Sequence, residues 1–177
     1  MKTKICFISR SSYPLFFQNN KATFGGAEVD IYLLANKLAK DLKYEVSCLV
    51  GDFGQKNVVT KDQVRIAKAF IKNVSVPYYY YYFAKIFMSQ KANTYFIEGS
   101  ILWVLPLAIL SKIRRSKLIY RFSSDIELEA KYLKRIFIKI GLRLCKSVIC
   151  QTTHQKHLAK HSYGIQASVI RNAIIPP

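Results

Sequence analysis

Short apolar runs and longer segments with helical periodicity alternate along the 177-residue chain. The first run, KICFIS at 4–9, is typical of a buried strand, and the segment 27–42 places apolar residues three and four positions apart. About six such alternations predict a parallel, doubly wound (Rossmann-like) α/β sheet with helices on both faces. Ligands of such sheets bind at the carboxyl ends of the strands, so residues that directly follow strands are the candidates for function.

The other elements are placed by residue range. Further strands are expected at 44–51, 94–100, 117–124, 146–152 and 167–177. Helices are expected at 27–42, 78–90, 101–113, 125–146 and 153–164, the last ending at a glycine, Gly164. The segment VRIAKAF at 64–70 fits either a short strand or the edge of a helix.

The composition indicates one folded, strongly basic domain. The chain is 51% hydrophobic and 14% aromatic, which excludes disorder, and its net charge is +18. Such a charge favours nucleic acid, an acidic membrane face or phosphorylated ligands, although an AT-rich genome also produces a Lys-rich bias. The four cysteines form no C-x-x-C pair and fit reduced thiols in the cytoplasm. We find no signal peptide, and the longest uncharged apolar run, 99–111, is too short to span a bilayer.

Two adjacent glycines, Gly25 and Gly26, precede the helical segment 27–42. They form either a tight turn or a helix start whose bare N–H groups approach a phosphate. The G-x-G-x-x-G fingerprint and the P-loop pattern are both absent, which disfavours a dehydrogenase or an NTPase. Two later helix starts, SSDIE at 123–127 and QTTHQ at 151–155, fit capping boxes, which explain these residues without a ligand.

Three further features each have a structural and a functional interpretation. The segment 125–146 is amphipathic, so it either packs on the sheet by its apolar arc or lies on an anionic membrane by its basic arc. The basic arc comprises Lys131, Lys134, Arg135, Lys139, Arg143 and Lys146, and the apolar arc comprises Leu133, Ile136, Phe137, Ile140 and Leu144. The run Tyr78–Tyr82 either packs in the core or forms a surface for sugar or lipid. Glu98 is interpreted either as a loop carboxylate that faces solvent, or as a residue that contacts acceptor hydroxyls or acts as a base.

The row His154, His157 and His161 has a spacing that can bind a metal, but no further ligand group accompanies it, so we expect no metal site. Nucleic-acid binding is the rival to an enzyme. The chain has no RNA-recognition aromatic motif, zinc pattern or clear helix-turn-helix. We therefore expect no nucleic-acid partner, and keep a non-catalytic anion- or nucleic-acid-binding α/β domain as the alternative function.

The stretch FGGAEVDIYLLANKLAKDLKYEVSCLVG at 24–51 resembles the opening of the group 1, family 4 glycosyltransferases, which have the GT-B fold. The stretches IYRFSSDIELE at 119–129 and SVICQTTHQKHLAKHSYGI at 147–165 are similar to later parts of their N-terminal domain. VIRNAIIPP at 169–177 is similar to the crossing into the second domain. The resemblance covers nearly the whole chain. It implies that 1–177 is a single N-terminal, acceptor-side domain, one half of a GT-B fold, without the C-terminal donor-binding domain.

The resemblance also implies a function. Such enzymes retain anomeric configuration, use no cofactor or metal, and transfer a sugar, here of the hexosyltransferase type, from a UDP- or GDP-sugar to a glycan or lipid-linked acceptor. It further implies a role in bacterial surface polysaccharide synthesis. The expected location is the cytoplasm, at the inner face of the membrane, where 131–146 would make peripheral contact with the anionic lipid surface. Without its second domain the chain is expected to be inactive.

The family's functional positions map onto this sequence residue by residue. Gly25 and Gly26 would contact the donor diphosphate, with Arg10 and Arg121 balancing its charge. The catalytic candidates that line the transfer crevice are Glu98, Ser123 and Asp125, and the residues at the interdomain crossing are Arg171 and Asn172. Two departures stand out: no histidine follows the strand at 117–124, and Ala173 replaces the glycine expected after Asn172.

Overall fold

The computed structural model describes residues 2–17, 24–125 and 132–171. These residues form two compact units, which are described separately. The first unit contains the chain up to Phe96 together with Arg114–Ser116, and the second contains Ile97–Ile113 and the chain from Lys117 onward. The strand β5 (Thr94–Glu98) begins in the first unit and ends in the second.

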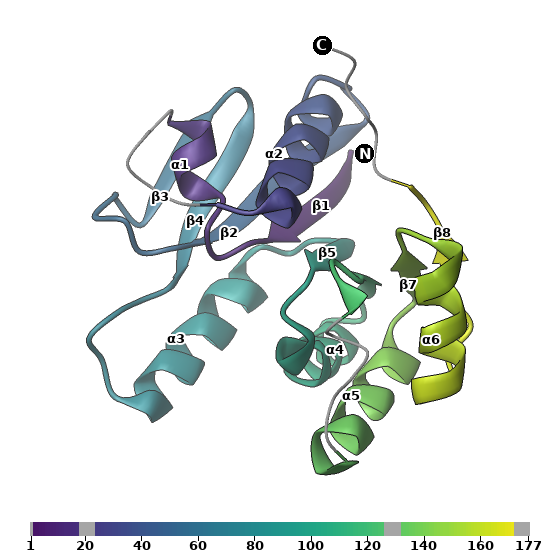
Figure 1. Cartoon of the computed structure of the whole chain (residues 1–177). Helices are drawn as coiled ribbons and strands as arrows, with labels where there is room; N and C mark the ends of the chain where they lie inside the picture. The colour runs from purple at the N-terminus through teal and green to yellow at the C-terminus, as the bar shows by residue number, and fades with distance from the viewer. Residues whose placement is uncertain (1, 18–23, 126–131, 172–177) are drawn as a thin grey trace. The chain divides into compact units, whose positions relative to one another are not determined.

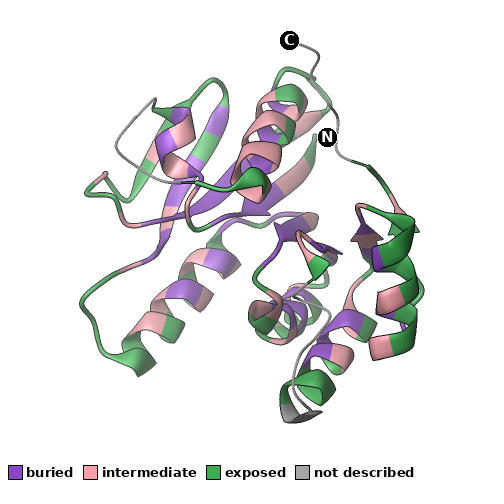
Figure 2. Cartoon of the chain, viewed as in Figure 1, coloured by how far each residue is buried: buried purple, intermediate pink, exposed green. Residues whose placement is uncertain are grey.

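The first unit is built on a mostly parallel sheet with the strand order β3-β4-β2-β1, followed by β5. Its strands are β1 (Thr3–Ile8), β2 (Tyr44–Gly51), β4 (Val64–Phe70) and the antiparallel β3 (Val58–Lys61). The middle strands are buried along most of their length, as Figure 2 shows. Continuous apolar runs are expected where helices cover both faces of a parallel sheet.

Helices of the first unit lie on both faces of this sheet. They are α1 (Tyr13–Phe16), α2 (Gly26–Ala39) and α3 (Val76–Ser89). The crossover through α2 leads from β1 to β2, whereas the crossover through α3 leads from β4 back past β1 to β5. Crossovers between parallel strands are almost always right-handed, so two that run in opposite directions are expected to place their helices on opposite faces. Figure 1 shows α2 and α3 on either side of the strands.

The second unit continues the alternation in one direction. After β5 come the short 3-10 helix η1 (Ile101–Trp103), α4 (Val104–Ile113), β6 (Lys117–Arg121), α5 (Tyr132–Leu144), β7 (Ser147–Cys150), α6 (Thr153–Tyr163) and β8 (Ser168–Val169). The parallel strands run β6-β7-β8, so right-handed crossovers place α5 and α6 on one face. Helix α5 packs against both α4 and α6.

The predicted α/β, doubly wound fold with a parallel sheet is confirmed, and the segment 64–70 is the strand β4. Several boundaries differ from the expected ones, and the strands expected at 94–100, 117–124 and 146–152 are shorter in the structure. The helix expected to reach residue 42 ends at Ala39, and Leu42 is 77% exposed. The short edge strand β3 was missed, and β8 is only two residues long, while 172–177 lie outside the described residues. Of the helix expected at 125–146, Tyr132–Leu144 is helical and 126–131 are not described.

Candidate functional site

Three polar side chains from successive strand ends meet in the second unit. Glu98 is the last residue of β5, Arg121 is the last residue of β6, and Gln151 directly follows β7. The Nη1 atom of Arg121 donates to Oε2 of Glu98 at 3.2 Å, and Nε2 of Gln151 donates to Oε1 of Glu98 at 2.9 Å. Each carboxylate oxygen of Glu98 therefore accepts a hydrogen bond, one from the end of the adjacent strand β6 and one from the residue after β7, the next strand along.

The Glu98–Arg121 ion pair is buried. The Glu98 side chain is 0% exposed and the Arg121 side chain is 10% exposed. Removing two charges from water is costly, and the cost is repaid only where geometry and extra hydrogen bonds are good. The Gln151 amide supplies such a hydrogen bond to the carboxylate, and the N–H of Gly99 joins the two strand ends by donating to the carbonyl oxygen of Arg121 at 3.0 Å. The sequence predicted that Glu98 lies at a strand end and that Arg121 balances phosphate charge, but not that the two residues pair.

The corner between β7 and α6 holds Gln151 in place. The Gln151 N–H donates to Oε1 of Gln155 at 2.8 Å, and the Gln155 N–H donates to Oγ1 of Thr152 at 3.0 Å. The predicted cap at Thr152 is confirmed, although the Gln155 side chain bonds Gln151 instead of closing the box on Thr152. Sequence reasoning missed Gln151 as a site residue. Its position directly after a strand is the signal that could have found it.

The turn after β5 is backbone-strained. Gly99 and Ser100 both have left-handed φ values, 68° and 54°. Serine adopts this conformation far less readily than glycine, so the strand end next to Glu98 stores conformational strain, a property that clusters at functional sites. The carbonyl of Ser100 accepts from the Trp103 N–H at 2.8 Å, which starts η1.

The remaining predicted residues of this unit come after β6 or after β8 in the sequence. Ser123 is half-buried and Asp125 is exposed, two and four residues beyond Arg121. Arg171 is exposed after β8, and Asn172 lies outside the described residues. The predicted capping box at Ser124 also depends on a residue outside them, Glu127.

In the first unit, the structure tests whether Gly25 and Gly26 are needed for a turn. Gly25 is the N-cap of α2 with φ −101° and ψ −177°, an extended backbone that any residue adopts. A Cβ on Gly26 would meet nothing within 4 Å, and one on Gly25 would meet only Oε2 of Glu28, at 3.1 Å. That Glu28 oxygen accepts from the Gly25 N–H at 2.9 Å. Among the described residues, neither backbone geometry nor packing requires glycine at these positions.

Arg10 and Gly51 join the loops that follow β1 and β2. The Gly51 N–H donates to the Arg10 carbonyl oxygen at 2.8 Å, and a Cβ on Gly51 would lie 2.6 Å from that oxygen. Glycine is thus required here by a close approach of two backbones. The Arg10 side chain itself is exposed.

A charged and aromatic group surrounds the end of β2, and sequence reasoning missed it. The Gly54 N–H and the Lys68 ammonium both contact the Asp52 carboxylate, and the Gly54 hydrogen bond is the main cause that lowers the pKa of Asp52. The Tyr13 ring stacks on Phe53 with centroids 5.6 Å apart, and Lys72 Nζ lies 5.5 Å from the Phe53 centroid.

The tyrosine run and the histidine row both lie at the surface. No residue of Tyr78–Tyr82 is buried, and Phe83 and Phe87 form the core side of α3, so packing of the tyrosines in the core was wrong. His154, His157 and His161 are exposed on α6. Within the described ranges, no group of three His, Cys, Asp or Glu side chains could hold a metal ion. No helix among the described residues is long and apolar enough to cross a bilayer.

Comparison with known proteins identifies the fold but no family. No protein-family model and no curated protein sequence matches this chain. Among solved structures, the crystal structure of Anabaena Alr3699/HepE in complex with UDP matches with a TM-score of 0.61 at 17% sequence identity. The match covers 98% of this chain and 44% of that chain. The chain therefore shares the α/β fold of a UDP-binding protein and spans less than half of its length.

Proposed function

We propose that the chain is the N-terminal, acceptor-side half of a GT-B glycosyltransferase of the family 4 type. One observation carries the proposal: nearly the whole chain has the fold of 44% of a protein that was crystallised with UDP. UDP is the nucleotide part of a UDP-sugar donor. The GGAE helix start and the order of the strands agree with the resemblance seen in the sequence.

The start of α2 is proposed to contact the donor diphosphate. Its first N–H groups have no partner within the helix, and the helix dipole favours an anion there. The two glycines support this role, because neither the backbone geometry nor the packing of the described residues requires glycine at these positions. Arg10 follows β1 and is proposed to balance part of the phosphate charge.

The strand ends of the second unit are proposed to serve sugar transfer. Glu98 and Arg121 act as a pair, in which the carboxylate orients the guanidinium toward the diphosphate. Ser123 and Asp125 contact the acceptor hydroxyl and the sugar. In the reaction the bond from the sugar C1 to the diphosphate oxygen breaks, a bond from C1 to the acceptor oxygen forms with retained configuration, and the acceptor proton leaves to solvent or a base.

The resemblance to the family 4 enzymes further supports an acceptor and an interdomain crossing. The acceptor is a glycan or a lipid-linked glycan in bacterial polysaccharide synthesis. Arg171 and Asn172 begin the crossing into a C-terminal domain that holds the nucleotide. The 177 residues by themselves are then expected to bind acceptor but not to turn over donor.

The experiment is a transfer assay on the natural full-length protein with UDP-sugars and GDP-sugars as separate donors. Gly26→Ala and Gly26→Val form a size series at a position with free space. We expect the alanine variant to keep most activity and the valine variant to lose at least tenfold, with unchanged thermal midpoints. Full activity in Gly26→Val would refute the phosphate contact. Salt-sensitive binding to RNA without any sugar transfer would favour the anion-binding alternative.

A further inference from the structure

Three aromatic rings stack on one another at the surface of the first unit. The Tyr13 ring stacks on Phe17 with centroids 4.7 Å apart and on Phe53 with centroids 5.6 Å apart. Phe17 and Phe53 are 38% and 39% exposed, and Tyr13 is half-buried. Single exposed apolar residues are common, but a contiguous exposed cluster often marks a binding surface. We call Tyr13, Phe17 and Phe53 the aromatic platform.

The loop that carries Phe53 is held in shape by its own hydrogen bonds. The Phe53 N–H donates to Oε1 of Gln55 at 2.7 Å, and Nε2 of Gln55 donates to the Gly51 carbonyl oxygen at 2.6 Å. Lys68 Nζ donates to the Gln55 carbonyl oxygen at 3.1 Å. The Phe53 ring lies against Gly51, because a Cβ on that glycine would be 3.2 Å from Phe53 Cε2. The platform is therefore preorganised, which lowers the entropy cost of binding a ligand.

The aromatic platform is built from segments that follow three parallel strands. Tyr13 and Phe17 belong to α1 and its C-cap, which follow β1, and Phe53 follows β2. Lys72 follows β4, and its Nζ lies over the Phe53 ring, 5.5 Å from the centroid. The strands β1, β2 and β4 are parallel neighbours. The platform thus lies at the carboxyl ends of the strands, the edge at which doubly wound sheets bind their ligands.

Charged and hydroxyl groups lie next to the rings. Burial is the main cause that raises the pKa of Tyr79, and the charge of Arg10 opposes this effect. Burial also raises the pKa of Tyr82, with Tyr78 and Asp52 adding to the effect. Both hydroxyl groups therefore lie within electrostatic reach of the loops after β1 and β2. Apolar rings next to such groups suit a ligand that has an apolar face and a polar edge.

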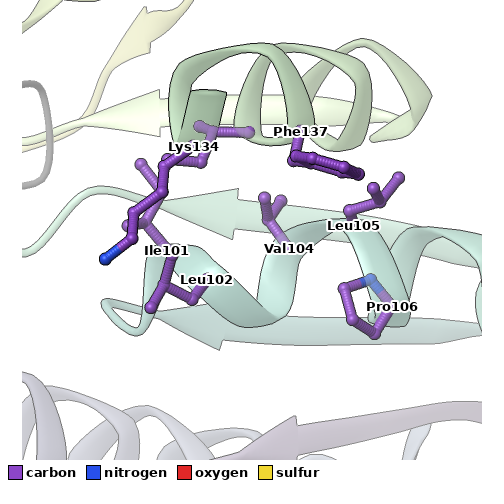
Figure 3. Close-up of a pocket in the computed structure, with 8 residues that line it drawn as sticks. Ile101, Leu102, Val104, Leu105, Pro106, Lys134 and Phe137 are labelled. Atoms are coloured by element: carbon purple, nitrogen blue, oxygen red, sulfur yellow. The ribbon is translucent and has the colours of Figure 1, made fainter. Parts of the chain in front are cut away.

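A hollow of about 280 Å³ in the second unit differs from the platform in its polarity. It lies between η1, α4 and α5, and seven of its eight lining side chains are apolar. Figure 3 shows Phe137 on one side of it and the charged Lys134 at one end. On α5, Ile136, Phe137 and Ile140 are 45%, 61% and 46% exposed, so the expectation that this apolar arc packs on the sheet was wrong for them. Phe137 is thus an exposed ring outside the platform and serves as a control.

We propose that the aromatic platform binds a saccharide ring that carries a carboxylate or a phosphate. The C–H face of the sugar lies on Phe53, because the negative face of an aromatic ring attracts positively polarised C–H groups as it attracts a cation. The exposed Lys72 side chain pairs with the acid group, and the Asp52 carboxylate accepts hydrogen bonds from sugar hydroxyls. The cations Arg10, Lys68 and Lys72 outnumber Asp52, so the local charge favours an acidic sugar over a neutral one.

The identification of this saccharide as the acceptor rests on the proposed function. A nucleobase also stacks on aromatic rings, so a nucleotide is the competing ligand. In the proposed enzyme the C-terminal domain holds the nucleotide, which leaves the platform to the acceptor. The inference then adds the substrate class, an acidic glycan, and a residue that selects it, Lys72.

The experiment measures binding of sugars to the natural full-length protein by saturation-transfer NMR titration. The probes are the methyl glycosides of glucose, galactose and mannose, the matching methyl uronides, and UMP. Phe53→Leu removes the ring but keeps apolar bulk, and Phe17→Leu does the same at the other exposed ring of the platform. Phe137→Leu is the matched control in the second unit. Lys72→Gln removes the charge over Phe53, and Lys37→Gln in the last turn of α2 is its control. Thermal midpoints verify that each variant is folded.

We expect at least one uronide to bind more tightly than its neutral partner. Phe53→Leu should weaken both members of that pair about fivefold, whereas Lys72→Gln should weaken the uronide alone, about threefold, and the controls should bind normally. No uronide binding, uronide binding that Phe53→Leu leaves unchanged, or UMP binding that Phe53→Leu weakens would each overturn the inference.

A transfer assay separates the inference from the proposed function. In an active enzyme, Phe53→Leu should raise KM for the acceptor and leave KM for the donor unchanged. Transfer with an unchanged acceptor KM in Phe53→Leu would refute the platform and leave the proposed function intact. Uronide binding that depends on Phe53, without transfer from any donor, would refute the proposed function and leave the saccharide site intact.

Discussion

The Oε2 atom of Glu98 lies 3.2 Å from Nη1 of Arg121, and no part of the Glu98 side chain is exposed. Arg121→Met would leave that carboxylate buried without its cationic partner, although the Gln151 amide still donates to Oε1. We expect the free energy of unfolding to fall by about 3–5 kcal/mol, measured by urea denaturation. Adding Glu98→Gln should recover part of the loss, because the buried charge is gone.

An exposed pair of the first unit provides the control. Lys4 Nζ lies 2.9 Å from Glu45 Oε2, with side chains 42% and 54% exposed. Lys4→Met should lower the free energy of unfolding by less than about 1 kcal/mol, because solvent screens the pair. Equal costs for Lys4→Met and Arg121→Met would mean that burial of the Glu98 pair has no energetic consequence.

Two helical glycines should respond in opposite ways to alanine. Gly141→Ala places a Cβ 2.7–2.8 Å from backbone atoms of Leu105, so we expect a loss of about 1–3 kcal/mol. Gly26→Ala places a Cβ in open space and should be neutral or slightly stabilising, because alanine has the better helix propensity. Thermal unfolding of the two variants in parallel checks the prediction. A Gly141→Ala protein with the same thermal midpoint as the wild type would contradict the close contact of α4 and α5.

Gly51→Ala tests the connection between the loops after β1 and β2. A Cβ 2.6 Å from the Arg10 carbonyl must push the two backbones apart and break the 2.8 Å hydrogen bond. We expect about 1–3 kcal/mol of destabilisation. Hydrogen exchange at the residue 51 amide should quicken far more than at Leu49, which lies inside the same strand. Unchanged protection at residue 51 would contradict the prediction.

Alkaline pH should destabilise the fold through its buried thiols. Burial raises the pKa of Cys48 from 9.0 to about 12 and also raises the pKa of Cys6. Between pH 9 and 12 the unfolded chain loses protons that the folded chain retains, so stability is complete below about pH 9 and falls as pH rises. The thermal midpoint should therefore drop between pH 8.5 and 10.5, and Cys48→Ala should reduce that drop. The same slope in both proteins would assign it to other groups, such as Tyr95, whose pKa burial raises to about 12.

The sequence predicted the α/β architecture because apolar runs and helical periods are local properties. The strand β3 was missed because its four residues, Val58–Lys61, lack an apolar run and pair only at the sheet edge. The position after a strand identified Glu98, and the family resemblance identified Arg121, but neither argument identifies which residues are partners. The ion pair and the Gln151 hydrogen bond depend on which strands are neighbours, and no local pattern contains that information.

The orientation of α5 was predicted wrongly for a similar reason. A helical wheel ranks Ile136, Phe137 and Ile140 as the face to bury, because it records polarity alone. It does not record how near another helix comes. Gly141 permits backbone contact with α4, and that contact decides which side of α5 is covered.

The close contact at Gly141 thereby determines the rotation of α5 about its own axis, because only the glycine side can approach the backbone of α4 so closely. Ile136, Phe137 and Ile140 keep about half of their surface exposed, so we expect substitutions there to destabilise the fold less than substitutions at the buried Ile138 and Leu142. Substitutions there can accumulate, or be designed, without loss of the α/β domain. Such substitutions would change the molecules that this surface of α5 binds, while the α/β core stays the same.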